Sequence, residues 1–206
     1  PGGGERAVLG LPPGDRGGSP MINLTTPLGD EVLDLRAGDR VTLSGTIYTA
    51  RDEAHLRMME EGIPFAPEGA VVYHCGPVVQ EGRLVVAGPT TSARMNALTG
   101  FLIDAGVRAL IGKGGMGPEV VEQLRGRAVY LALTGGCAAL AAARMRLCGV
   151  YFEDLGMAEA VWVIKADHLP LTVGIDAHGG DLFRAVREKA KTQFHQRFNS
   201  KQDSVS

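Results

Sequence analysis

The chain has 206 residues, of which 45% are hydrophobic and 21% charged, and it carries a formal net charge of −2 at pH 7. This composition is typical of one sizeable globular domain, and it lacks the basic field that binding to nucleic acid or to a membrane surface requires. Three cysteines without a CxxC pair favour a reducing, cytoplasmic location, and no apolar run approaches the roughly 20 residues that span a bilayer.

Three regions are predicted along the chain. Residues 1–20 are rich in Gly and Pro and predict a flexible leader or linker, residues 21–200 predict one domain, and residues 201–206 predict a frayed tail. Short apolar runs within the domain predict strands at Arg40–Thr49, Ala70–His74, Arg83–Ala87, Arg108–Ile111, Ala128–Leu133, Gly149–Phe152, Ala160–Lys165 and Leu171–Ile175. Helical periodicity predicts helices at Asp52–Glu61, Ser92–Ala105, Pro118–Leu124, Cys137–Arg146 and Leu182–Arg197. This alternation predicts an α/β fold without fixing the strand order.

The segment GPTTSARM at residues 88–95 joins a predicted strand to a predicted helix. Gly88 and the proline after it end the strand, and the hydroxyls of Thr90 and Thr91 can cap the helix. A helix N-terminus attracts anions, and Arg94 lies one turn further along on the same face. The segment therefore predicts a pocket for a small carboxylate or phosphate, and carboxylate is the better fit.

Two other strand ends carry a single cation each. Arg51 lies where a predicted strand runs into a helix at residues 48–55, and Lys113 lies in a glycine loop at residues 110–117. Strand ends are the usual location of ligand sites in α/β domains. We expect Arg51, Arg94 and Lys113 to surround one dianionic ligand such as a dicarboxylate.

Each of these features also has a simpler interpretation. The loop at residues 112–117 matches GxGxxG, but no acidic residue follows roughly 20 positions later to bind a ribose, so dinucleotide binding is the weaker alternative. Arg51 could instead form a helix-start ion pair of little energetic value. Thr90 and Thr91 could be only capping residues. We expect His55 to be a histidine on a helix surface and His74 a histidine of the core.

Taken together, the cationic segments resemble the β component of the iron–sulfur hydro-lyases, the class I fumarase and L-tartrate dehydratase family. The resemblance runs from about Met21 to Phe183 and includes the segments LRAGDRV at 35–41, YHCGP at 73–77, GGCAAL at 135–140 and EDLGM at 153–157. It implies a swivelling three-layer β/β/α domain with mixed sheets.

The resemblance also implies an activity, the reversible removal of water from a 2-hydroxy dicarboxylate. Thr90 matches the threonine proposed as the base in this family. The substrate-binding residues that it implies are Arg51, Gly88, Thr90, Thr91, Arg94 and Lys113. The segment Ser92–Asn96 looks more like fumarase, which favours malate and fumarate, with L-tartrate as the alternative substrate. A non-enzymatic carboxylate-binding module is a further alternative.

Family members carry a [4Fe-4S] cluster on three cysteines, and the resemblance assigns those cysteines to the α component. We therefore expect no metal site in this chain and interpret Cys75, Cys137 and Cys148 as buried thiols. The implied partner is an α subunit or a fused N-terminal domain that carries the cluster, in an (αβ)2 or homodimeric assembly. Without that partner, we expect the chain to have no turnover.

Overall fold

The computed structural model describes residues 21–134 and 138–202, so the predicted leader, Cys137 and residues 203–206 lie outside the description. The strands are β1 (Ile22–Thr25), β2 (Arg40–Thr49), β3 (Val71–Tyr73), β4 (Val78–Gln80), β5 (Arg83–Val86), β6 (Ala109–Gly112), β7 (Val129–Ala132), β8 (Met145–Tyr151) and β9 (Val161–Ile175). The α-helices are α1 (Asp52–Glu61), α2 (Gly100–Asp104), α3 (Pro118–Leu124), α4 (Ala138–Ala142) and α5 (Leu182–Gln202). Short 3-10 helices are η1 (Asp30–Asp34), η2 (Ser92–Leu98) and η4 (Glu153–Leu155).

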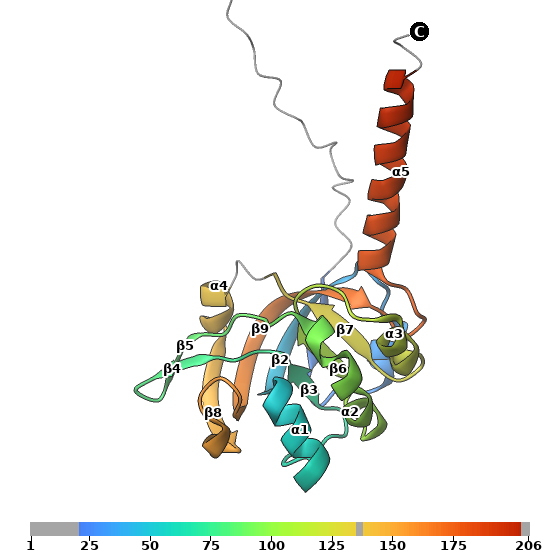
Figure 1. Cartoon of the computed structure of the whole chain (residues 1–206). Helices are drawn as coiled ribbons and strands as arrows, with labels where there is room; N and C mark the ends of the chain where they lie inside the picture. The colour runs from blue at the N-terminus through green and yellow to red at the C-terminus, as the bar shows by residue number, and fades with distance from the viewer. Residues whose placement is uncertain (1–20, 135–137, 203–206) are drawn as a thin grey trace, which may run out of the picture.

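The main sheet closes into a five-stranded barrel (Figure 1). Strands β2, β3, β6 and β7 pair in parallel, one after another. Strand β9 runs antiparallel to both β7 and β2 and so joins the two ends of the row. Closure satisfies the edge groups that an open sheet would leave unpaired.

Strands β2 and β9 can close the barrel because each changes neighbours along its length. The first half of β2 pairs with β1, and its end at Tyr48 and Thr49 pairs with β3. On β9, residues 161–166 pair with β8 and residues 172–175 pair with β7. Strands β1 and β8 therefore extend the sheet beyond the barrel wall.

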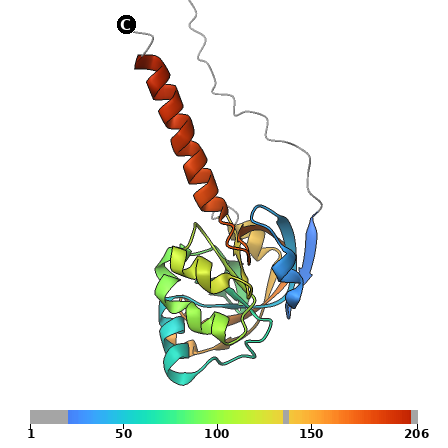
Figure 2. The same cartoon turned by 90° about the vertical axis from the view of Figure 1, so that its right-hand side faces the viewer.

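The core has two parts because the short barrel strands are buried on both faces. On β3, Val71 and Tyr73 belong to the cluster inside the barrel, whereas Val72 belongs to the cluster beneath the helices. Strands β6 and β7 alternate in the same way. Helices α1, α2 and α3 cover one side of the barrel, with β1 on the opposite side (Figure 2). Burial on both faces explains why these strands appear as continuous apolar runs in the sequence.

Several predicted elements are confirmed and others are wrong. The bounds of β2, α1 and α3 agree with the prediction. The predicted helix at residues 92–105 is instead η2 followed by α2, with a break at Thr99. Glycine at position 100 is a poor helix former, and a Cβ there would lie 2.9 Å from Gln123 Nε2, so its absence allows α2 to pack closely.

The segment between residues 137 and 175 differs most from the prediction. Strand β8 begins at Met145, within the predicted helix, because its residues pair with β9. The two strands predicted at 160–165 and 171–175 are one continuous strand, β9. Pro170 is tolerated within it because it lies between the part that pairs with β8 and the part that pairs with β7.

The mixed α/β class is confirmed. Helix α5 extends from Leu182 to Gln202, five residues beyond the predicted end, and stands clear of the barrel (Figure 1). Within the described part of the chain, no helix combines the length and the apolar character needed to cross a membrane.

Asp176 holds the turn between β9 and α5. Its side chain is 3% exposed and accepts backbone N–H bonds from Ala37 at 2.8 Å, His178 at 2.9 Å and Gly180 at 2.7 Å. Burial acts to raise the pKa of this carboxyl, but the N–H donors outweigh it and lower the pKa. The carboxylate therefore ties the loop that precedes β2 to the entry into α5.

We expect Asp176→Asn to reduce the free energy of unfolding at pH 7 by about 1–3 kcal/mol, because the amide NH2 would face a backbone donor. A depressed folded pKa contributes stability that is present above the unfolded pKa and is lost as the pH falls through the folded pKa. The acid-induced loss of stability below about pH 4 should therefore be smaller in the variant than in the wild type. Urea unfolding across pH values checks this, with the exposed Asp34→Asn as control. Equal acid sensitivity of wild type and Asp176→Asn would contradict it.

Candidate active site

The C-terminal ends of β2, β3 and β6 lie at one edge of the barrel because these strands are parallel and adjacent. The pairing continues past the strand ends, since Ala50 N–H donates to Tyr73 O at 3.0 Å and His74 N–H donates to Ile111 O at 2.8 Å. Arg51 follows β2 and Lys113 follows β6. Two of the three predicted cations are therefore placed at the same edge.

The predicted segment around Thr90 lies between the continuations of β3 and β6. Thr90 N–H donates to His74 O at 2.7 Å, and Lys113 N–H donates to Thr90 O at 3.2 Å. Ser92 N–H then donates to Lys113 O at 3.0 Å, and Thr91 and Lys113 form a β-bridge. The backbone thus fixes Thr90 and Thr91 beside Lys113, with Gly88 two residues upstream.

The predicted cap at Thr91 is wrong. Thr91 is the N-cap residue of η2, but its side chain makes no capping hydrogen bond. The helix that follows is a 3-10 helix, not the α-helix that the prediction required. Arg94 nevertheless turns toward the neighbouring strand end, where its Nη2 atom lies 2.7 Å from Asp52 Oδ2. The third cation is therefore tied to the first turn of α1.

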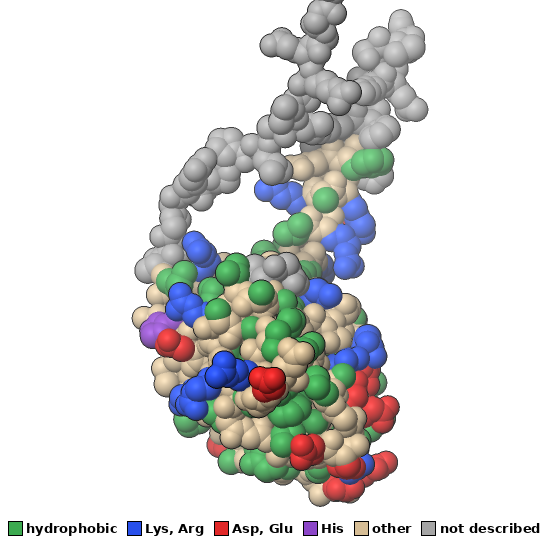
Figure 3. Space-filling view, turned by 90° about the vertical axis from the view of Figure 1, so that its left-hand side faces the viewer, with side chains coloured by type: hydrophobic (Ala, Val, Ile, Leu, Met, Phe, Trp, Pro, Cys, Tyr) green, Lys and Arg blue, Asp and Glu red, His purple; other side chains and the backbone are tan. Residues whose placement is uncertain are grey.

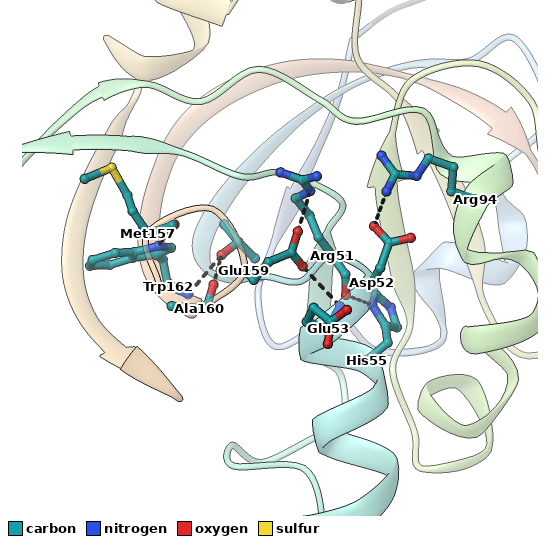
Figure 4. Close-up of polar contacts among 10 residues, drawn as sticks. Arg51, Asp52, Glu53, His55, Arg94, Met157, Glu159, Ala160 and Trp162 are labelled. Atoms are coloured by element: carbon teal, nitrogen blue, oxygen red, sulfur yellow. Dashed lines mark hydrogen bonds and ion pairs between the residues drawn. The ribbon is translucent and has the colours of Figure 1, made fainter. Parts of the chain in front are cut away.

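Arg51 forms an ion pair with Glu159, a residue that the sequence analysis missed. Arg51 Nε lies 3.2 Å from Glu159 Oε1, and the other carboxylate oxygen accepts the N–H of Glu53 at 3.1 Å. Figure 4 shows Arg51 and Arg94 on either side of Asp52 at the start of α1. Glu159 lies two residues after the EDLGM segment at 153–157, which the resemblance includes. That segment is the sequence feature that could have pointed to Glu159.

The three cations lie on an open face. The Arg51 and Arg94 side chains are 23% and 53% exposed, and Lys113 is exposed as well. A cavity of about 470 Å³ lies elsewhere, between the 115–118 loop and the base of α5, and none of the three cations lines it. The chain therefore presents a cationic surface at this edge.

Exposed apolar side chains occupy the side of the molecule that carries the β4–β5 hairpin, α4 and β8. Figure 3 views this side, and hydrophobic side chains are spread across it. The exposed residues are Val78, Val85, Leu140, Tyr151 and Met157. Surface of this kind is typical of protein contacts.

Beneath the cationic face lie two buried histidines. His74 belongs to the core as predicted, but the surface position predicted for His55 is wrong, because His55 is 0% exposed. His55 Nδ1 lies 2.7 Å from Arg51 O, and since a carbonyl only accepts, this nitrogen carries the proton. Burial lowers the pKa of His55, opposed by the Arg51 carbonyl and Asp52, and lowers the pKa of His74 further. Both imidazoles are therefore neutral at pH 7.

A buried chain of hydrogen bonds reaches from His74 to the Lys113 loop. His74 Nδ1 lies 2.8 Å from Ser92 Oγ, which lies 3.0 Å from the Tyr130 hydroxyl. The same hydroxyl lies 2.9 Å from Gly114 O, to which it can donate. A Cβ at Gly112 would occupy the space of Ser92 Oγ, so the glycine there makes this arrangement possible. Its role is close packing, and its φ is not in the left-handed region.

The described cysteines do not fit a metal cluster. Cys75 is buried, and burial is the main reason why its pKa rises to about 12, whereas Cys148 is exposed on β8, contrary to the prediction. Cluster ligands are thiolates, so a thiol that resists ionisation is a poor one. Among residues 21–134 and 138–202, no group of three His, Cys, Asp or Glu side chains is placed to hold a metal ion.

A family model described as the fumarase C-terminus matches residues 13–186. Because the match covers most of the chain, the chain belongs to this family. A relative from Methanocaldococcus jannaschii named "Putative L(+)-tartrate dehydratase subunit beta" is 42% identical over 173 residues, which are 77% of this chain and 89% of the relative. The L(+)-tartrate dehydratase subunit beta of Escherichia coli K12 is 38% identical over 170 residues, 77% of this chain and 85% of that subunit.

One relative is a much longer protein. The Geobacillus stearothermophilus protein named "Putative fumarate hydratase class I" is 34% identical over 185 residues, which are 85% of this chain but 36% of the relative. The family therefore includes chains comparable in length to this one and chains in which the matching segment is about a third of the whole.

We expect Gly112→Ala to lower the free energy of unfolding by about 1–3 kcal/mol, because the new methyl group must displace Ser92 Oγ and separate it from Tyr130. The matched control is Gly149→Ala on β8, where a Cβ would meet only Val163, at 3.8–3.9 Å. Its effect should stay within about 0.5 kcal/mol. Urea unfolding measures both, and equal losses would contradict the packing argument.

Proposed function

We propose that this chain is the β component of an iron–sulfur-dependent hydro-lyase that reversibly removes water from a 2-hydroxy dicarboxylate. The observation that carries the proposal is the placement of Arg51, Arg94 and Lys113 around adjacent strand ends in a chain of the fumarase C-terminus family. Two guanidinium groups and an ammonium suit a ligand with two carboxylates.

The role proposed for the cations follows from the chemistry of dehydration. The proton on C3 is weakly acidic, so the negative charge that develops as it leaves must be stabilised. Cations bound to the adjacent carboxylate spread that charge into the carboxylate oxygens. We assign this role to Arg51, Arg94 and Lys113. The hydroxyl group on C2 leaves with a proton as water, and a carbon–carbon double bond forms between C2 and C3.

Thr90 is the proposed site of proton abstraction, with Gly88 and Thr91 contributing to the binding surface. Backbone bonds to His74 and Lys113 support this assignment because they fix Thr90 beside the lysine. A threonine hydroxyl is too weak a base by itself, so a neighbouring group must relay its proton. We assign that relay to the α component.

The α component, separate or fused, would also supply the [4Fe-4S] cluster. Two observations favour a partner at this face: the cations lie on an open surface, and exposed apolar side chains lie nearby on the β4–β5 hairpin and β8. The names of the relatives from M. jannaschii and E. coli, both β subunits, support a separate partner. A swivelling three-layer arrangement, a cytoplasmic location and an (αβ)2 or homodimeric assembly remain parts of this proposal.

The substrate has two candidates. The likeness of Ser92–Asn96 to fumarase favours malate and fumarate. The names of the relatives at 42% and 38% identity favour L-tartrate. These substrates differ by one hydroxyl group, so kcat/KM for malate and for L-tartrate must be compared directly.

The function is tested with the full chain, purified alone and after mixing with a cluster-bearing α component of the same family. We expect turnover of malate or L-tartrate only in the mixture. In that mixture, Lys113→Ala should reduce kcat/KM by about 10²–10³, because one source of charge stabilisation is lost. The control is Lys191→Ala on α5, which removes the same charge from a helix that stands clear of the barrel.

Two outcomes would contradict this proposal. Appreciable dehydration by the cluster-free chain alone would show that no second component is needed. Full activity of Lys113→Ala, in a variant whose circular dichroism matches that of the wild type, would show that Lys113 does not take part in binding or catalysis.

Substitutions at Thr90 separate a catalytic hydroxyl from a purely structural residue. We expect Thr90→Ser to retain most activity and Thr90→Ala to lose about 10²-fold or more in kcat, because only serine keeps the hydroxyl. Steady-state kinetics of the reconstituted enzyme measures both variants. Unchanged kcat in Thr90→Ala would show that the Thr90 hydroxyl takes no part in catalysis and that only its backbone contributes to the structure.

A further inference from the structure

The connection between β8 and β9 contributes a carboxylate to the cationic face. We propose that Glu159 is a positioning residue for Arg51, which it orients so that the terminal nitrogens of the guanidinium face the substrate carboxylate. This inference rests on the proposed function, because it concerns how the same site binds a dicarboxylate.

The Glu159 carboxylate contacts two groups at the start of α1. Its Oε1 atom lies 3.2 Å from Arg51 Nε, and its Oε2 atom accepts the N–H of Glu53 in the first turn of α1 at 3.1 Å. Arg51 Nε is buried and hydrogen-bonds no atom of the described residues, so this carboxylate compensates its charge. The contact is at Nε, which leaves Nη1 and Nη2 for a second carboxylate.

Gly76 packs directly against the Arg51 side chain. A Cβ at this position would lie 2.8 Å from Arg51 Nη1, 2.9 Å from Arg51 Cδ and 2.7 Å from Ala158 O. The arginine and the β8–β9 connection therefore both pack directly on the backbone of Gly76. This contact gives a physical reason for glycine in the YHCGP segment.

The connection that carries Glu159 is itself fixed to the end of β2. Thr49 Oγ1 accepts the backbone N–H of Trp162 at 2.9 Å and donates to Ala160 O at 3.3 Å. The indole N–H of Trp162 donates to Met157 O at 2.8 Å. Figure 4 shows Met157, Ala160 and Trp162 on the side of Glu159 away from Arg94. Glu159 is thus held in place, as orienting another side chain requires.

The same carboxylate could instead compete with the substrate for Arg51. The two roles predict opposite signs: loss of a positioning carboxylate weakens dicarboxylate binding, and loss of a competing carboxylate strengthens it. Because the ion pair involves Nε and not the terminal nitrogens, the geometry favours positioning.

The decisive variant is Glu159→Gln, because its amide oxygen can still accept the Glu53 N–H while the ion pair with Arg51 is lost. In the reconstituted enzyme we expect KM for the dicarboxylate to rise about tenfold, with kcat changing less than about threefold. The matched control is Asp154→Asn, which removes an equal charge from the same connection, where Asp154 pairs with Arg57 of α1 at 3.0 Å. Its KM should stay within about twofold of the wild-type value.

A second measurement needs no activity. In heteronuclear NMR of the full chain, the Arg51 Nε–H signal, assigned by its loss in Arg51→Lys, should exchange slowly with solvent. The slow exchange is expected from the burial of Nε, and Glu159→Gln should accelerate it, because the guanidinium is then no longer held by the ion pair and Nε can reach solvent. Asp154→Asn should not accelerate it. If the wild-type enzyme fails to turn over with its partner, the proposed function fails, and the exchange measurement still tests the positioning of Arg51.

Gly76→Ala perturbs the same arginine, because the new methyl group would overlap Arg51 Nη1 and Cδ, and we expect it to raise KM in the same way. Unchanged or lowered KM in Glu159→Gln would overturn the inference. The inference would also be overturned if Glu159→Gln and Gly76→Ala only lower the thermal midpoint of unfolding, while KM and the exchange rate of the Arg51 Nε–H stay at their wild-type values.

Discussion

The antiparallel pairing of β2 with β9 is the contact on which the rest of the structure depends. It closes the barrel, and it also places Tyr48 opposite Val163, so that the residues just after β2 lie beside those just before β9. Arg51 follows β2 by two residues and Glu159 precedes β9 by two. The pairing that satisfies the sheet edges therefore also forms the ion pair at the candidate site. Disrupting either strand would disturb fold and site together.

Placing several cations at one edge raises a problem of like-charge repulsion, and the structure resolves it locally. Arg94 is paired with Asp52, and Arg51 with Glu159, through one nitrogen in each case. Each guanidinium has five N–H donors, so one such contact leaves most of them available. The acidic partners thereby lower the cost of assembling the face without saturating it.

How much the sequence could predict depends on the range of the interactions involved. The bounds of α1 and α3 follow from local signals, such as the proline that opens α3, and the three cations follow from the strand ends beside them. The continuity of β9 across Pro170, the burial of His55 and the role of Glu159 depend on contacts between segments far apart in the chain. Glu159, for example, contacts Arg51 across 108 residues of sequence. Periodicity and capping rules contain no information on such pairs.

The buried histidines limit what can control the pH dependence of this site. Burial lowers the pKa of both His55 and His74, so neither gains a proton near neutrality. The hydrogen bond from His55 to the Arg51 carbonyl therefore persists through the neutral range, and the start of α1 keeps its position. A change of activity near neutral pH must then arise in the substrate, in the group that relays the proton from Thr90, or in the partner that completes the face.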